Sequence, residues 1–175
     1  ESQGQRKRVQ ISKAERPELL ESLVGHKIVK VDAGHQHMIA LDDGGHVYAC
    51  GFGGYGRLGL KDTHNRYEPE IVQTLAHIQC RDVEAGADHS LALTITGDVF
   101  WWGRDGTKTD GKGRPQPVTN LSGIGVTKLS AGRGFNFALT STGQVWVWGQ
   151  AMFKECYGLG STIAGTSMIH SPRLI

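Results

Sequence analysis

The sequence predicts an all-β protein built from repeated copies of one structural unit. Three glycines, each preceded by alanine, lie 17 residues after a proline and 17 residues before another glycine: Gly34, Gly86 and Gly132. Glycine supplies 25 of the 175 residues, about twice its usual share of ~7%. Charged residues make up 21%, which is near the average, so the chain is a turn-rich globular protein rather than a disordered one.

Further positions recur in the same frame. An Ala-Leu pair follows each central glycine, and a Gly-x-Val segment follows that pair: Ala40, Leu41, Gly45 and Val47; Ala92, Leu93, Gly97 and Val99; Ala138, Leu139, Gly143 and Val145. The sequence units run over residues 17–68, 69–114 and 115–171, and another begins at 172. Their lengths differ only in the tail before the next proline, as expected of surface segments that tolerate insertion.

Each unit is expected to contain four strands. In the first unit, residues 29–33, 37–41 and 47–50 are short β-branched or alternating segments with glycine-bearing breaks between them, which predicts three strands. A fourth strand is expected after the proline, over 71–75 and again over 118–121, because proline fits the first residue of a strand. Residues 17–23 have a helical pattern, but their alignment with the segment that begins at Pro69 favours a strand.

Four short antiparallel strands per unit of about 50 residues are typical of the blade of a β-propeller. The repeated pattern resembles the regulator of chromosome condensation repeat. The residues that carry the resemblance are Ala33, Gly34, His37, Gly45, Gly51, Gly56, Leu58 and Gly59, then Ala85, Gly86, His89, Gly97 and Gly103, then Ala131, Gly132, Gly143, Gly149, Gly158, Leu159 and Gly160. The resemblance covers residues 17–175. It implies a seven-bladed propeller, of which this chain holds about three blades and, at 172–175, the opening strand of another.

One segment points to a branch of this family. CGFGGYGRLG, residues 50–59, is similar to the corresponding blade of the mitotic telophase-disk branch, and the next unit, which lacks a Gly-x-Leu-Gly loop, is similar to it too. The third unit departs from the pattern, because Phe135 and Asn136 stand where the other units place a histidine. A ligand site that needs a histidine in every unit is therefore not expected.

The N-terminus, the cysteines and the net charge indicate the cellular compartment and the kinds of partner to expect. Residues 1–16 are predicted to be a polar linker with a basic cluster, Arg6 to Arg8, and the chain is interpreted as an excised piece. Its three cysteines are odd in number and have no CxxC spacing, which favours a reducing compartment, nuclear or cytoplasmic. A net charge of +2 is too small to argue for nucleic acid. No apolar run approaches the length of a membrane span, so no membrane contact is expected.

Motifs that carry chemistry are weak. Gly51, Gly53 and Gly56 satisfy GxGxxG after a strand, but no helical pattern follows, so a structural turn is favoured over a cofactor site. The histidines and cysteines lack the close pairing of metal ligands. Four tryptophans lie on the last predicted strands of units two and three: Trp101, Trp102, Trp146 and Trp148. One plant branch senses light with tryptophans, but packing between blades is favoured. We expect no catalytic, cofactor or metal residues.

Partner-binding residues are expected in the irregular tails, since scaffold residues are committed to packing. The candidates are charged residues of these tails: Arg57, Arg104, Asp105, Lys108, Lys112, Arg114 and Lys154. Basic and acidic residues alternate in the second tail, which favours a solvated loop over a nucleic-acid surface.

The resemblance implies binding rather than bond chemistry. Members of the family act as platforms for small GTPases and chromatin, and the telophase-disk branch is tied to mitosis. The expected function is a protein-interaction scaffold. The alternative is a guanine-nucleotide exchange factor, which needs only a surface that prefers the nucleotide-free GTPase. Three blades by themselves leave open sheet edges, so we expect them to need the remaining blades, another copy or a partner.

Overall fold

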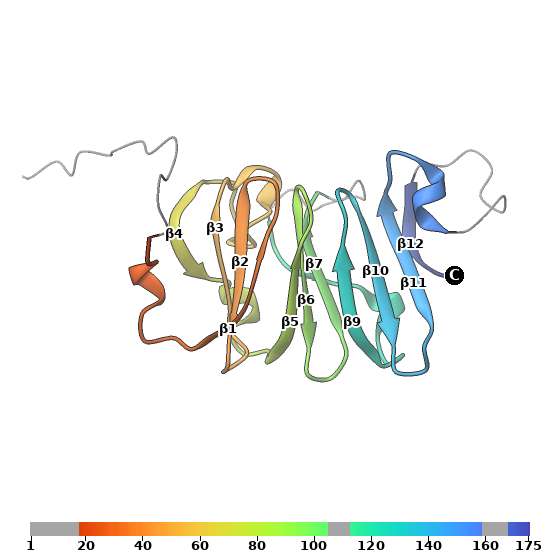
Figure 1. Ribbon diagram of the computed structural model, residues 1–175, viewed down its shortest axis with the longest axis horizontal. Coiled ribbons are helices and arrows are strands. Elements are labelled where there is room, and N and C mark those ends of the chain that lie inside the picture. Colours follow the sequence, from red (N-terminus) through yellow and green to blue (C-terminus); the bar gives the residue numbers. More distant parts are fainter. Residues whose placement is uncertain (1–17, 105–112, 159–167) are drawn as a thin grey trace, which may run out of the picture.

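The computed structural model describes residues 18–104, 113–158 and 168–175, and the predicted linker, 1–16, lies outside them. Twelve strands form three four-stranded antiparallel sheets, which lie side by side in sequence order (Figure 1). In each sheet the strands are adjacent in chain order. The predicted all-β fold with four-stranded antiparallel blades is therefore confirmed.

The first sheet consists of β1 (Ile28–Ala33), β2 (His37–Asp42), β3 (Val47–Gly51) and β4 (Arg66–Ile71). The second consists of β5 (Cys80–Ala85), β6 (His89–Thr94), β7 (Val99–Gly103) and β8 (Gln116–Pro117). The third consists of β9 (Val126–Ala131), β10 (Phe135–Thr140), β11 (Val145–Gln150) and β12 (Met168–Leu174). Short 3₁₀ turns connect them: η1 (Glu21–Leu23), η2 (Gly54–Gly56), η3 (Gln73–Leu75), η4 (Thr119–Leu121) and η5 (Lys154–Tyr157).

The first three strands of each sheet form where the repeat frame predicts them. Each central glycine lies in the turn between the first and second strands, and each Gly-x-Val segment opens the third strand. Gly45, in the β2–β3 turn, has φ +84°, and a Cβ there would lie 3.0 Å from the backbone of Cys80. The turn approaches the second sheet closely, and the Cys80 N–H donates to the Gly45 carbonyl at 3.0 Å. Glycine therefore serves both the turn and the contact between sheets.

The expected position of the fourth strand is wrong. β4 ends at Ile71, and residues 73–75 and 119–121 form the turns η3 and η4 instead of strands. Val72 and Leu75 are both buried, as are Val118 and Leu121. This three-residue spacing buries both side chains in a 3₁₀ turn, whereas alternation would have favoured a strand. The described part of the aligned residues 17–23 also ends in a 3₁₀ turn, η1, rather than a strand, but η1 contains no buried residue.

The expectation that residues 172–175 open a further blade is also corrected. Pro172 lies in β12, which pairs with β11 as the fourth strand of the third sheet. Pro69 lies likewise in β4, whereas Pro115 directly precedes β8, so the proline that opens a sequence unit lies in or directly beside the last strand of the preceding sheet. These strands form the outer edge of each sheet, where the missing N–H of proline costs no ladder hydrogen bond.

The core lies between the sheets. β5 packs against β1 and β2, and β9 packs against β5 and β6. One apolar cluster joins the first two sheets, and a second joins the last two. On the two outer sheets, apolar side chains stay exposed, such as Val29 and Val31 on β1 and Leu139 on β10. In the described part of the chain, no helix has the length and apolar character needed to cross a membrane.

Candidate interaction groove

The turns between the first and second strands form a hydrogen-bonded row across the three sheets. The residues that directly follow the central glycines are His35, Ala87 and Arg133. The His35 N–H donates to the Ala87 carbonyl at 3.2 Å, and the Ala87 N–H donates to the Arg133 carbonyl at 3.2 Å. The row holds the three turns at one end of the sheets and fixes the spacing of their side chains.

The same turns hold the residues that leave the third strands. The Gln36 carbonyl accepts the Phe52 N–H at 2.7 Å, and the Asp88 carbonyl accepts the Arg104 N–H at 2.8 Å. In the third sheet, the Gly134 carbonyl accepts the Gln150 N–H at 2.6 Å. Arg104 and Gln150 are therefore held against the row of turns by their own backbones.

Arg57 joins the first two sheets. It is 1% exposed, and its guanidinium donates to the carbonyls of Gly54 at 2.9 Å and Ala87 at 3.2 Å. It also forms an ion pair with Asp88 at 2.9 Å. A partner surface cannot reach this buried guanidinium, so Arg57 serves the junction between sheets rather than the expected surface contact.

The backbone of Arg57 completes a buried polar cluster with Ser90 and Trp102. Both the Ser90 hydroxyl and the Trp102 indole N–H donate to the Arg57 carbonyl at 2.9 Å. Since Ser90 uses its hydrogen there, its oxygen accepts from His37 Nε2 at 2.9 Å. Burial lowers the pKa of His37 to about 4, and the nearby charges of Arg57 and His89 act in the same direction. His37 is therefore a neutral donor at pH 7.

The second junction, between the second and third sheets, places different residues at the same repeat positions and joins them by different hydrogen bonds. His89 and Asn136 stand one sheet further along than His37 and Ser90. The Asn136 amide nitrogen donates to His89 Nε2 at 2.6 Å, and its oxygen accepts the Trp148 indole N–H at 3.2 Å. Asn136 thus forms hydrogen bonds with both the histidine and the tryptophan of its junction. In the first junction, Ser90 binds the histidine and the Arg57 carbonyl binds the tryptophan.

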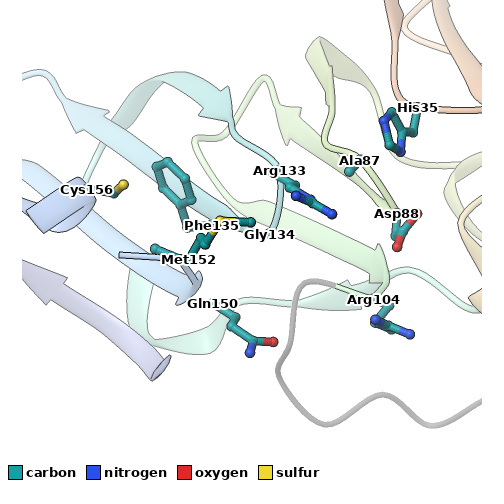
Figure 2. A pocket seen from close by; sticks show the side chains of 11 residues that line it. His35, Ala87, Asp88, Arg104, Arg133, Gly134, Phe135, Gln150, Met152 and Cys156 are labelled. Carbon is teal, nitrogen blue, oxygen red and sulfur yellow. The ribbon is translucent and has the colours of Figure 1, made fainter. Parts of the chain in front are cut away.

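Above the second junction, the described residues enclose a groove of about 370 Å³. His35, Asp88, Arg104 and Arg133 contribute its imidazole, carboxylate and guanidinium side chains. Figure 2 shows Phe135, Met152 and Cys156 on one side of Arg133, and His35, Asp88 and Arg104 on the other. The groove therefore has an apolar end on the third sheet and a mainly cationic end near the first and second sheets.

Apart from the buried Arg57, the predicted partner residues lie as follows. Arg104 and Arg114 are exposed, and Arg104 lines the groove with its guanidinium 4.3 Å from the centre of the Tyr55 ring. Asp105, Lys108 and Lys112 lie outside the described residues, and Lys154 opens η5. Arg133, which lines the groove together with Arg104, lies outside the irregular tails in which partner contacts are expected. The sequence signal that could have identified Arg133 is variation at one repeat position: the residue directly after the central glycine is histidine, alanine and arginine in the three units.

The GxGxxG glycines are explained by backbone contacts. A Cβ at Gly53 would collide with the carbonyl of His64, and a Cβ at Gly56, which has φ +71°, would collide with the Cα of Gly113. These glycines let the loop fold on itself and against the tail of the second unit. No group of three or more metal-ligating side chains is gathered among the described residues.

The tryptophans contribute to packing. Trp102 and Trp148 are buried in the two junctions, 1% and 2% exposed. Trp101 and Trp146 pack in part against the cluster between the second and third sheets. Trp101 and Trp102 are adjacent on β7 and therefore lie on opposite faces of that strand, whereas Trp146 and Trp148 are two residues apart on β11 and share one face.

Known proteins share both the sequence pattern and the fold. The profile of the regulator of chromosome condensation (RCC1) repeat matches residues 44–93, and a second profile of this repeat matches residues 28–57, 80–107 and 126–151. The ultraviolet-B receptor UVR8 of Arabidopsis thaliana is 37% identical over 90 residues, which are 51% of this chain and 20% of that protein. The probable E3 ubiquitin-protein ligase HERC4 of Homo sapiens is also 37% identical over 90 residues, 51% of this chain and 8% of that protein.

Solved structures extend the likeness to most of the chain. Human WBSCR16 superposes with a TM-score of 0.73 at 26% identity, over 86% of this chain and 38% of that one. A chain in the structure of Kap60 bound to yeast RCC1 (Prp20) also gives a TM-score of 0.73, at 25% identity, over 86% of this chain and 36% of that one. This chain thus spans well under half of the relatives that it matches. The repeat profiles, the three four-stranded sheets and these superpositions together show that the chain belongs to the regulator of chromosome condensation (RCC1) repeat family.

Proposed function

We propose that this chain is part of a protein-interaction scaffold. The observation that carries the proposal is the row of turns: backbone hydrogen bonds from sheet to sheet hold His35 and Arg133 in place, exposed beside a groove. Turns whose backbone is held in advance lose little backbone freedom on binding, which favours recognition by such a surface. The partners that we propose are small GTPases, chromatin or mitotic proteins, in the nucleus or the cytoplasm.

Two lines support this choice of partners. One solved relative is yeast RCC1 (Prp20) bound to Kap60, and Prp20p of Saccharomyces cerevisiae was also described with its binding properties to Gsp1p and histones. Those properties belong to that protein, and we extend them here as a proposal. The segment 50–59 further supports the telophase-disk branch.

Guanine-nucleotide exchange is the alternative, and nucleotide release separates it from scaffolding. The full-length parent protein is mixed with a panel of small GTPases loaded with a fluorescent GDP analogue, and the nucleotide-free GTPases are captured in parallel. The scaffold proposal expects capture of a partner without faster release. Faster release from one GTPase would establish exchange activity, and absence of capture across the panel would turn the search to chromatin and mitotic partners.

The outer sheet faces also need a cover in this proposal. Val29 and Val31 are 56% and 58% exposed on β1, and Leu139 is 37% exposed on β10. Such faces favour association with further blades, another copy or a partner. We expect the 175-residue chain by itself to self-associate or unfold at low temperature in light scattering and melting experiments. A monomer that melts cooperatively at an ordinary temperature would contradict this expectation.

A further inference from the structure

We propose that the groove above the second junction binds a short acidic peptide segment of a partner protein, in which a carboxylate side chain lies next to an apolar one. The proposal rests on the proposed function as an interaction scaffold and adds the chemistry of the partner at one site. It commits to a peptide because the groove, at about 370 Å³, suits a few side chains rather than a folded surface.

The charge of the groove favours a carboxylate. Arg104 and Arg133 are both exposed in its lining, with His35 near them. Asp88 is the one acidic side chain among the described lining residues, and its charge is offset by Arg57 at 2.9 Å. Arginine presents a planar fork of donors that matches a carboxylate with two parallel hydrogen bonds.

Arg104 is positioned before any ligand arrives. Its backbone N–H is held by the Asp88 carbonyl at 2.8 Å, and its guanidinium lies over the Tyr55 ring at 4.3 Å. Stacking of this kind orients the guanidinium while leaving its edge free for hydrogen bonds. The ordering cost that a flexible surface arginine pays on binding is thereby reduced.

The opposite end of the groove favours an apolar side chain. Met152 is 66% exposed, and Phe135 and Cys156 line the groove beside it (Figure 2). Methionine and aromatic side chains are enriched at the centres of protein interfaces, where their burial contributes to binding. A peptide that spans the groove would place its carboxylate near the arginines and its apolar side chain near Met152.

Side chains of the groove, rather than its backbone, would recognise the peptide. The carbonyls of Ala87, Arg133 and Gly134 each already accept a backbone N–H. The groove therefore does not present the free row of backbone groups that strand addition requires. Selectivity would come from the charge and apolar character of the peptide.

The test uses the full-length parent protein and a fluorescein-labelled peptide, Glu-Glu-Leu-Glu-Glu-Phe-Glu-Glu, in fluorescence anisotropy titrations. We expect this peptide to bind, and two control peptides to bind about tenfold more weakly or worse, one with lysine for glutamate and one with glycine for leucine and phenylalanine. Arg133→Glu and Arg104→Glu should each weaken binding by about tenfold or more. Higher salt should weaken binding as well.

The matched control is Lys27→Glu, the same reversal of charge at the other end of the first sheet. Lys27 precedes β1 and is 77% exposed, whereas His35 follows β1 about 20 Å away along the strand. This variant should bind the peptide within about twofold of the unaltered chain. Circular dichroism and thermal melting establish that each variant is folded, and Arg133→Gln replaces Arg133→Glu if the reversal disturbs folding.

Three results would overturn the proposal. They are equal binding of all three peptides, unchanged binding by the folded Arg133 and Arg104 variants, and displacement of the peptide by a single-stranded oligonucleotide that binds more tightly. Capture of a protein partner distinguishes this failure from failure of the scaffold. If the partner is captured while the acidic peptide does not bind, the groove proposal fails and the scaffold stands.

Discussion

The two junctions between neighbouring sheets use equivalent positions of the repeat, but different hydrogen bonds join the sheets at each. In both, a histidine at the start of the second strand reaches the residue one position further along in the next sheet: His37 to Ser90, and His89 to Asn136. In the first junction, His37 Nε2 donates its hydrogen, whereas in the second, His89 Nε2 accepts one from the Asn136 amide. The frame thus sets the position of a contact and leaves its chemistry free.

The larger difference between the two junctions lies beside the turns that join the first and second strands of the sheets. In the first junction, Arg57 sits between the sheets and binds both Ala87 and Asp88. Beside the corresponding turn residues of the second junction, Arg133 and Gly134, the described residues enclose a groove. The comparison teaches that repeated positions join the sheets, and that the irregular tails decide whether the space above a junction is filled by the chain itself.

The strongest test of this comparison removes Arg57. Arg57→Ala leaves Asp88 without its buried partner and opens space in the first junction, so we expect a loss of about 3 kcal/mol in the free energy of unfolding. Urea denaturation followed by circular dichroism measures the loss. Arg104→Ala, the exposed arginine of the second junction, should change the same quantity by less than about 0.5 kcal/mol. Equal losses would contradict the distinction between the junctions.

Acid should weaken the first junction through His37. Its pKa is lowered from 6.5 to about 4 in the folded protein, chiefly by burial. Between these two values the unfolded chain binds the proton more readily, so the stability is complete above about pH 6.5 and is lost as the pH falls toward 4. From pH 7 to pH 5 the loss should be about 2 kcal/mol, since one pKa unit corresponds to about 1.4 kcal/mol.

His37→Phe isolates this pH dependence, because Phe135 occupies the same frame position in the third sheet. The variant lacks the titrating group, while the other titratable side chains are unchanged. We expect its unfolding free energy to fall less steeply between pH 7 and pH 5 than that of the unaltered chain. Parallel pH profiles for the two proteins would refute the assignment to His37.

Asn136 provides a smaller test in the second junction. Asn136→Leu keeps a similar volume but removes the amide that meets both His89 and Trp148, so we expect a loss of about 1.5 kcal/mol. Ser90→Ala in the first junction should cost less, about 1 kcal/mol, because Trp102 still donates to the Arg57 carbonyl. Thermal melting of both variants measures the difference, and a larger loss for Ser90→Ala would reverse our interpretation.

The smallest expected effect is at Lys30 on β1. It contacts the carboxylates of Asp82 and Glu84, the latter at 2.6 Å. Burial lowers the pKa of Lys30, but the hydrogen bonds and charges of these carboxylates outweigh it and raise the pKa. Because Lys30 is partly exposed, Lys30→Met should cost only about 0.5 kcal/mol, and less in high salt.

Lys128 is the matched control for that experiment. It holds the frame position of Lys30 in the third sheet, where its side chain is exposed. Lys128→Met should leave the free energy of unfolding within about 0.3 kcal/mol of the unaltered value in low salt. A loss as large as that of Lys30→Met would show that the contact with the second sheet contributes nothing.

Sequence patterns predict most of the strands, but they do not predict that the prolines lie inside outer strands rather than at the start of a new strand. The first three strands of every unit follow from alternation and from glycine at the turns. Pro69 and Pro172 instead lie inside outer strands, because the missing N–H of proline is tolerated at any edge position that faces away from the sheet. Sequence alone cannot tell that an edge is present, since pairing between strands is a property of the assembled sheet.

The sequence by itself determined the repeat frame, the all-β class and the family, because these depend on spacings along the chain. Only the tertiary structure decided the fate of the individual charged residues. Arg57 and Arg104 both follow third strands in irregular tails, yet one is buried against Asp88 and the other lines a groove with Arg133. Burial and charge pairing depend on which side chains of the neighbouring sheet lie close to a residue. Those side chains are far away in the sequence, so no local sequence pattern identifies them.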